Sequence, residues 1–101
     1  MSKLHVVWHS AKAASNLRKH RVSFDEAKTV LYDPDVLIKP DIEHAEIEDR
    51  AQAVGLSEKL RTLFVVFVDL EGETIRLISA RRATTTEAAT YAKQKEERQK
   101  R

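Results

Sequence analysis

The chain has 101 residues, 42% hydrophobic and 34% charged, which predicts one highly charged globular domain spanning residues 1–101. It has no cysteine, which excludes disulfides and thiolate metal sites and suits a reducing cytoplasm. No apolar run approaches the ~20 residues of a membrane span, and no signal peptide is visible, so a cytoplasmic protein without membrane contact is expected.

The formal net charge is only +2, but it is distributed unevenly. Residues 1–50 hold eight Lys/Arg and nine Asp/Glu, a balance of −1, whereas residues 51–101 hold ten and seven, a balance of +3. Basic clusters at 16–21 and 81–82 contrast with five acids between Asp41 and Asp49. Basic clusters of this kind can form a local patch for phosphates. Composition alone does not decide the partner.

The N-terminal third predicts a strand followed by two helices. Residues 4–9 are short, apolar and β-branched, as in a strand. Ser10 is positioned to cap a helix over residues 11–20. The inward face of this helix is expected to carry Ala13, Ala14 and Leu17.

The second helix is predicted from its capping signal. Ser23 and Glu26 have the S-x-x-E spacing of a capping box. The apolar positions that follow fall on one side of a helix, namely Phe24, Ala27, Val30 and Leu31. Asp33 and Pro34 end it, because proline removes a donor and restricts the preceding residue.

The middle of the chain predicts strands. Residues 35–39 indicate a short strand closed by Pro40, and residues 50–57 indicate another. The continuous apolar run within 61–70 is typical of a central strand covered on both faces. A hairpin turn at Gly72 leads into a returning strand over 74–83.

A second capping box, Thr84 to Glu87, predicts a C-terminal helix. Its turns from Lys93 onward are almost wholly charged, so residues 93–101 are expected to fray. The order of elements predicts an α+β domain, a mainly antiparallel sheet with two N-terminal helices and one C-terminal helix.

Alternation along the returning strand makes Arg81 a candidate. Strict period-two alternation puts Arg81 on the same face as Ile75 and Leu77, with Arg76 on the opposite, solvent-accessible side. A buried guanidinium needs an anionic or hydrogen-bonding partner. Either Arg81 pairs with an internal acid or it forms an anion site at the end of the strand. The internal acids considered are Glu48, Asp49 and Glu87.

His20 and Trp8 also have two interpretations. His20 can act as a general acid or base, or can cap the helix dipole. Trp8 can pack in the core or cover an RNA base. His44 lies among acids whose spacing matches no metal site, which favours a solvated loop over 41–49.

Three ordered motifs between residues 8 and 91 resemble the BrnT toxin family. The first is the family's K-x-x-x-N-x-x-K-H-x-V-S-F-x-E-A run, matched here by Lys12, Asn16, Lys19, His20, Val22, Ser23, Phe24, Glu26 and Ala27. The second is a D-x-x-H…E-x-R segment followed by a G-x-S strand end, matched by Asp41, His44, Glu48, Arg50, Gly55 and Ser57. The third is matched by Arg76, Ile78, Ser79, Ala80, Arg81, Ala83, Thr84, Glu87 and Tyr91.

Two positions depart from the family pattern. His9 stands where the family usually has Asp, and the sequence SEKLRT replaces a Gly-Arg turn before the central strand, with Arg61 as the substitute cation. The resemblance implies a RelE-like ribonuclease fold and the toxin half of a type II toxin–antitoxin pair. It also implies an RNA substrate, a BrnA-like ribbon-helix-helix antitoxin, and binding of promoter DNA only through the antitoxin complex.

For the chemistry, the resemblance implies RNA cleavage without a metal or cofactor and a 2′,3′-cyclic phosphate product. Such cleavage needs a base, cations for the developing phosphorane charge, and an acid for the leaving oxygen. His20 or Glu48 is the candidate base. The candidate cations are Lys19, Arg50, Arg76 and Arg81. The candidate substrate contacts are Lys12, Trp8, Arg61 and Arg82.

Two further expectations follow from the resemblance. Arg81 is expected to matter more for activity than for folding, and the sheet is expected to be the antitoxin's docking surface. An alternative of another class is a non-catalytic module that only sequesters an antitoxin or RNA, since a fold does not imply a function.

Overall fold

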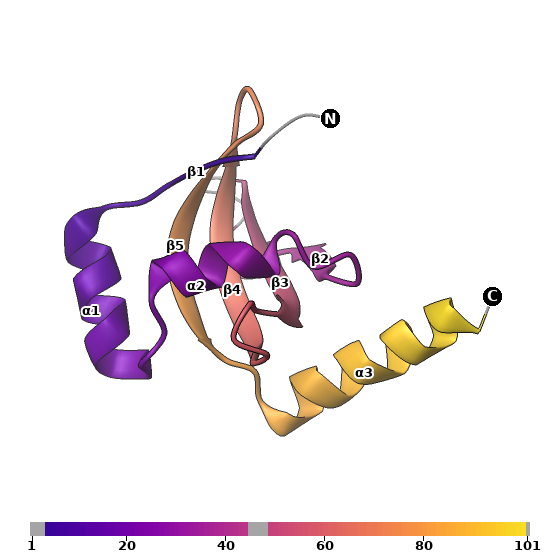
Figure 1. Cartoon of the computed structure of the whole chain (residues 1–101). Coiled ribbons are helices and arrows are strands. Elements are labelled where there is room, and N and C mark those ends of the chain that lie inside the picture. Colours follow the sequence, from indigo (N-terminus) through magenta and orange to yellow (C-terminus); the bar gives the residue numbers. More distant parts are fainter. Residues whose placement is uncertain (1–3, 45–48, 101) are drawn as a thin grey trace.

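The computed structural model describes residues 4–44 and 49–100. Figure 1 shows a sheet flanked by helices, with the C-terminal helix running away from the other elements. The strands are β1 (His5–Val7), β2 (Leu37–Pro40), β3 (Arg50–Leu56), β4 (Thr62–Leu70) and β5 (Thr74–Arg82). The helices are α1 (Ser10–His20), α2 (Phe24–Val30) and α3 (Thr85–Gln99), with a 3-10 turn η1 (Ile42–His44).

The sheet has the order β1-β5-β4-β3-β2. The pairings of β2 with β3, β3 with β4, and β4 with β5 are antiparallel, whereas β1 runs parallel to β5. The α+β class is confirmed, and the sheet is mixed. β4 occupies the centre of the sheet, as its continuous apolar run predicts.

α2 lies across one face of the sheet and forms the core with it (Figure 1). The capping serine, Ser23, accepts a hydrogen bond from the N–H of Glu26. The buried core side chains come from the α1–α2 connection, α2 and three strands, and include Val22, Phe24, Ala27, Val30, Ala53, Leu63, Val65, Phe67, Ile75 and Leu77. α2 ends close to β3 at Gly55, where a Cβ would lie 3.0 Å from Val30 Cγ1, so a larger residue would crowd this contact.

The buried residue of α1 is a polar one, Asn16, which is 6% exposed. Its Nδ2 donates to the carbonyls of Val22 (3.0 Å) and Ala80 (2.8 Å), and the N–H of Ala80 donates to its Oδ1 (3.0 Å). β1 pairs with β5 only over Thr74–Arg76, so the Asn16 amide satisfies the edge of β5 further along.

The predicted inward face of α1 is therefore right only for Ala13, which packs against the core. Ala14 is exposed and Leu17 is 48% exposed, so their predicted burial is wrong. Ser10 is also not the cap, because the helix begins at Ser10 and the N-cap position is His9. The helix is held to the sheet through a hydrogen-bonding amide at the strand edge, which an apolar periodicity cannot reveal.

Replacing Asn16 with alanine is expected to lower the free energy of unfolding by about 1–3 kcal/mol, because it leaves buried backbone groups of Val22 and Ala80 without a partner. Chemical denaturation of Asn16→Ala beside Ser15→Ala, its neighbour on the same helix, measures the effect. Equal stability of the two variants would contradict the role given to Asn16.

α3 is fastened at both of its halves. Thr84 and Glu87 form the predicted capping box, and the hydroxyl of buried Tyr91 donates to Asp33 Oδ2 at 2.5 Å. Further along, Lys95 Nζ lies 4.0 Å from Asp35. α3 extends to Gln99 in this structure, and fraying of the charged end from residue 93 stays a prediction. None of the helices in the described ranges is long and apolar enough to cross a membrane.

Candidate active site

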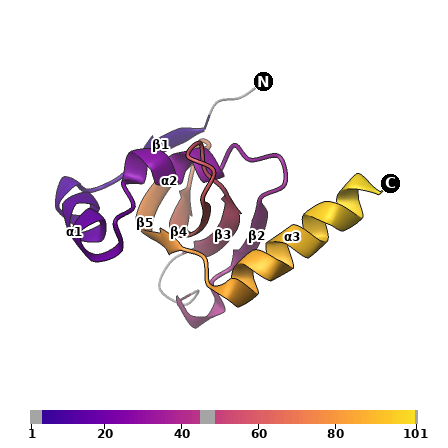
Figure 2. The same ribbon diagram turned by 60° about the horizontal axis from the view of Figure 1, so that its bottom comes forward.

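The face of the sheet opposite α2 carries most of the predicted cations, and we call it the open face. In Figure 2, α2 lies on one side of the strands and the open face is on the other. The strand register arranges its side chains in rows across β3, β4 and β5. The rows are Arg50–Val68–Arg76, Gln52–Val66–Ser79 and Val54–Phe64–Arg81.

A β-bulge in β5 decides which residues reach this face. Val66 pairs with Ser79 but the next residue, Phe67, pairs with Leu77, so Ile78 is an extra residue in the ladder. Ile75 and Leu77 consequently face the core, whereas Arg81 lies on the open face. The prediction that Arg81 shares a face with Ile75 and Leu77 is wrong, because it assumed uninterrupted alternation.

Arg81 is held by a carboxylate. Its Nη1 and Nη2 donate to the two carboxylate oxygens of Glu87 at 2.9 and 3.0 Å, and its guanidinium carbon lies 4.1 Å from the ring centre of Phe64. Among the acids considered from the sequence, the partner is Glu87. The Arg81 guanidinium holds the pKa of Glu87 below its usual value. Arg81 thus ties β5 to the first turn of α3, which is the structural one of its two interpretations.

Arg81→Ala is therefore expected to lower the free energy of unfolding by about 1 kcal/mol, a modest loss because both side chains are partly exposed. Arg81→Lys should recover only part of it, because lysine lacks the bidentate fork. Thermal unfolding of both variants tests this. An unchanged melting temperature with cleavage abolished would restore the catalytic role expected from the sequence.

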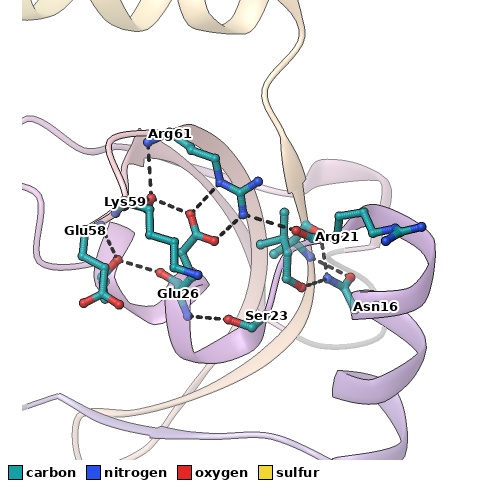
Figure 3. Close-up of polar contacts among 11 residues, drawn as sticks. Asn16, Arg21, Ser23, Glu26, Glu58, Lys59 and Arg61 are labelled. Carbon is teal, nitrogen blue, oxygen red and sulfur yellow. Dashed lines mark hydrogen bonds and ion pairs between the residues drawn. The ribbon is translucent and has the colours of Figure 1, made fainter.

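Arg61 is also engaged inside the protein (Figure 3). Its Nε donates to Glu26 Oε2 at 2.9 Å, and its Nη2 donates to Glu26 Oε1 and, at 3.2 Å, to the carbonyl of Arg21. The Ser57 hydroxyl donates to the same carboxylate at 2.7 Å. Arg61 therefore has a structural role in holding Glu26, and its expected role in binding substrate stays a prediction.

Glu26 is 1% exposed, and its charge explains this arrangement. A buried carboxylate is costly unless it is paired and hydrogen-bonded. The Arg61 hydrogen bond is the main cause that holds the pKa of Glu26 below its ordinary value. Only half of the predicted capping box forms here. Ser23 caps the helix, but the Glu26 side chain turns to Arg61 instead of back to the backbone of Ser23.

The remaining candidates lie outside the rows of the open face. Lys12, Lys19 and His20 are exposed on α1, beside β5, and Arg82 is exposed at the end of β5. Trp8 packs edge-on against Phe24, with ring centres 5.9 Å apart, which supports its core interpretation. Glu48 lies outside the described residues. Within the described ranges, no three His, Asp or Glu side chains lie close enough together to hold a metal ion.

Two polar residues of the open face were not singled out from the sequence. Gln52 and Ser79 share a row between the Arg50–Arg76 row and Arg81. The Gln52 Nε2 donates to Asp41 Oδ1 at 3.3 Å. Alternation within residues 50–56 places Arg50 and Gln52 on one face, so the sequence alone could have indicated the position of Gln52. It could not indicate the position of Ser79, which depends on the bulge.

Two partly buried arginines share one row of the open face. Arg50 and Arg76 occupy the same row on either side of Val68, so their side chains lie above one region of the sheet. Beyond Gln52, the face continues toward α3 into a pocket of about 390 Å³, lined by residues that include Leu37, Lys39, Val54, Thr86 and Thr90. Guanidinium groups suit phosphate because of their planar fork of donors.

Similarity to known proteins identifies the family of this chain. A search of curated proteins finds no match. Among solved structures, the fold is similar to the ribonuclease toxin BrnT of Brucella abortus, with a TM-score of 0.65 and 24% identity, covering 82% of this chain and 100% of that one. The family model described as the ribonuclease toxin BrnT of type II toxin-antitoxin systems matches residues 8–87. Because this match spans more than half of the 101 residues, the chain belongs to the BrnT family of ribonuclease toxins.

Proposed function

We propose that this ribonuclease toxin cleaves RNA on the open face, at the row formed by Arg50 and Arg76, without a metal ion. The observation that carries the proposal is the placement of these two arginines in one row of the sheet, on the two strands that flank Val68. Two guanidinium groups there would neutralise the charge that develops on the phosphate oxygens, which is the largest electrostatic requirement of the reaction.

In the proposed reaction, the 2′-oxygen of the RNA attacks the adjacent phosphorus and the bond to the 5′-oxygen breaks. A base removes the proton of the 2′-hydroxyl, and an acid supplies one to the leaving oxygen. The product is a 2′,3′-cyclic phosphate with a free 5′-hydroxyl. His20 and Glu48 remain the proposed bases, and Lys19 a further cation, on the strength of the family resemblance.

Metal removal tests this proposal. Cleavage of a labelled single-stranded RNA is expected to proceed at an unchanged rate in excess EDTA and to leave 2′,3′-cyclic phosphate ends detected by mass spectrometry. Loss of cleavage in EDTA, restored by added Mg²⁺, would contradict metal independence. An absence of cleavage under every condition would favour the non-catalytic binding module.

The proposed partner is a BrnA-like ribbon-helix-helix antitoxin that docks on the sheet of a RelE-like toxin in the cytoplasm. The basic side chains of the open face support an acidic segment as the part that binds, because complementary charge favours such a contact. Promoter DNA would then be bound only through the complex. A small ribbon-helix-helix protein encoded in the adjacent reading frame, and slow growth of cells that express the toxin alone, would both support this pairing.

A further inference from the structure

The N-terminal part of the chain is entirely free of acidic residues. The first acid is Asp25, and residues 1–24 hold five Lys/Arg. Two of these cations, Arg18 and Arg21, lie three positions apart at the end of α1. With Leu17 they make up what we call the α1 basic surface.

The α1 basic surface is accessible. Arg18, Lys19 and Arg21 are all exposed, and Leu17 keeps 48% of its surface in solvent. Leu17, Arg18 and Arg21 line a shallow hollow. An apolar side chain that shares a hollow with two arginines offers a nucleotide a contact for its base and charge for its phosphates.

Hydrogen bonds hold the backbone at the C-terminal end of this surface. Arg21 has the left-handed conformation that ends α1, with φ 58°, and its N–H donates to the carbonyl of Leu17. The Arg21 carbonyl accepts a hydrogen bond from Arg61, and the Val22 carbonyl accepts one from Asn16. In Figure 3, the side chain of Arg21 points away from this network. The backbone is thus fixed while the charged end remains free to bind, which lowers the entropy cost of binding.

A favourable interaction with the helix dipole explains only part of the clustering of basic residues at the end of α1. A cation in the last turn of a helix contributes about 0.3–1 kcal/mol, but neighbouring like charges also repel one another. A polyanion removes that repulsion by placing phosphates between them.

We propose that the α1 basic surface is a second RNA-binding surface, which holds phosphates of the substrate other than the one that is cleaved. The proposal rests on the ribonuclease activity and deepens it, because it assigns recognition of longer RNA to Arg18 and Arg21. A single-stranded RNA bound here would place a base against Leu17 and phosphates on Arg18 and Arg21.

Binding to a 30-nucleotide RNA with 2′-O-methyl groups separates this surface from the chemistry, because such RNA cannot be cleaved through the 2′-oxygen. The double variant Arg18→Gln/Arg21→Gln is expected to weaken binding about 10- to 30-fold at 0.1 M salt. It should also reduce the slope of log affinity against log salt by about 1.4, that is, about 0.7 for each of two lost phosphate contacts. Lys19 is left in place because it is a candidate for the cleavage step.

The matched control is Lys93→Gln/Lys100→Gln, which removes the same charge from exposed positions of α3. It is expected to bind like the unmodified protein. A four-nucleotide substrate, which has few phosphates besides the one that is cleaved, should keep its kcat/KM within about twofold in the Arg18/Arg21 variant.

Unchanged affinity and salt slope in the Arg18/Arg21 variant would overturn the proposal. An equal loss of affinity in the α3 control would also overturn the proposal, because it would show a general charge effect. A parallel loss of activity on the short substrate would overturn it as well. If the unmodified protein cleaved no RNA, the proposed function would fail, while binding to the methylated RNA would still test the surface.

Discussion

Replacing Arg76 with alanine is expected to lower kcat/KM for RNA cleavage by at least about 100-fold, the usual cost of removing one group that stabilises the charge of a transition state. Arg76 lies on the open face in the same row as Arg50, so its loss would remove one of two guanidinium groups from the proposed scissile phosphate. The loss should fall mainly on kcat, because the charge on the phosphate grows toward the transition state.

The conservative variant separates catalysis from folding. Arg76→Lys should recover part of the activity, because it keeps the charge but not the bidentate geometry. Arg98→Ala is the matched control, because it removes an arginine from an exposed position of α3. This variant should cleave RNA normally. Thermal unfolding is measured for all three variants. Normal cleavage by Arg76→Ala, or a loss explained by unfolding, would remove Arg76 from the proposed site.

Replacing Arg61 with alanine is expected to lower the free energy of unfolding by about 3–5 kcal/mol, which is the largest stability effect anticipated for this protein. The reason is that Glu26, at 1% exposure, would keep its charge and lose its main partner. Lys59→Ala, in the same turn but exposed, is the matched control and should change stability little.

The pH dependence of the stability lost in Arg61→Ala is a second measurement on the same variants. Because the folded pKa of Glu26 lies below its ordinary value of 4.5, the stability it contributes is complete above about that pH and is lost as the pH falls through the folded pKa. In Arg61→Ala, burial favours protonation of Glu26, so the deficit should narrow on acidification. Denaturant titrations between pH 7 and pH 3 measure it. A deficit independent of pH would show that Glu26 is not the residue affected.

The order and type of the elements could be predicted from the sequence. The apolar run within β4, the Gly72 turn and the Thr84–Glu87 capping box each act over a few neighbouring residues, and each was confirmed. The resemblance to the BrnT family also depended on the order of residues alone, and the family model confirms it.

The placement of the charged side chains was decided by tertiary structure. A single extra residue at Ile78 reverses the faces of β5, so Arg81 meets Glu87 instead of the core. Arg61 reaches Glu26 across 35 positions of sequence, and Asn16 reaches Ala80 across 64. Local periodicity depends on near neighbours, whereas the partner of a charge depends on strand register and on which distant segments pack together. Near-neighbour patterns therefore suffice to predict the elements and the family, whereas the carboxylate partners of Arg61 and Arg81 and the shared row of Arg50 and Arg76 follow from the fold.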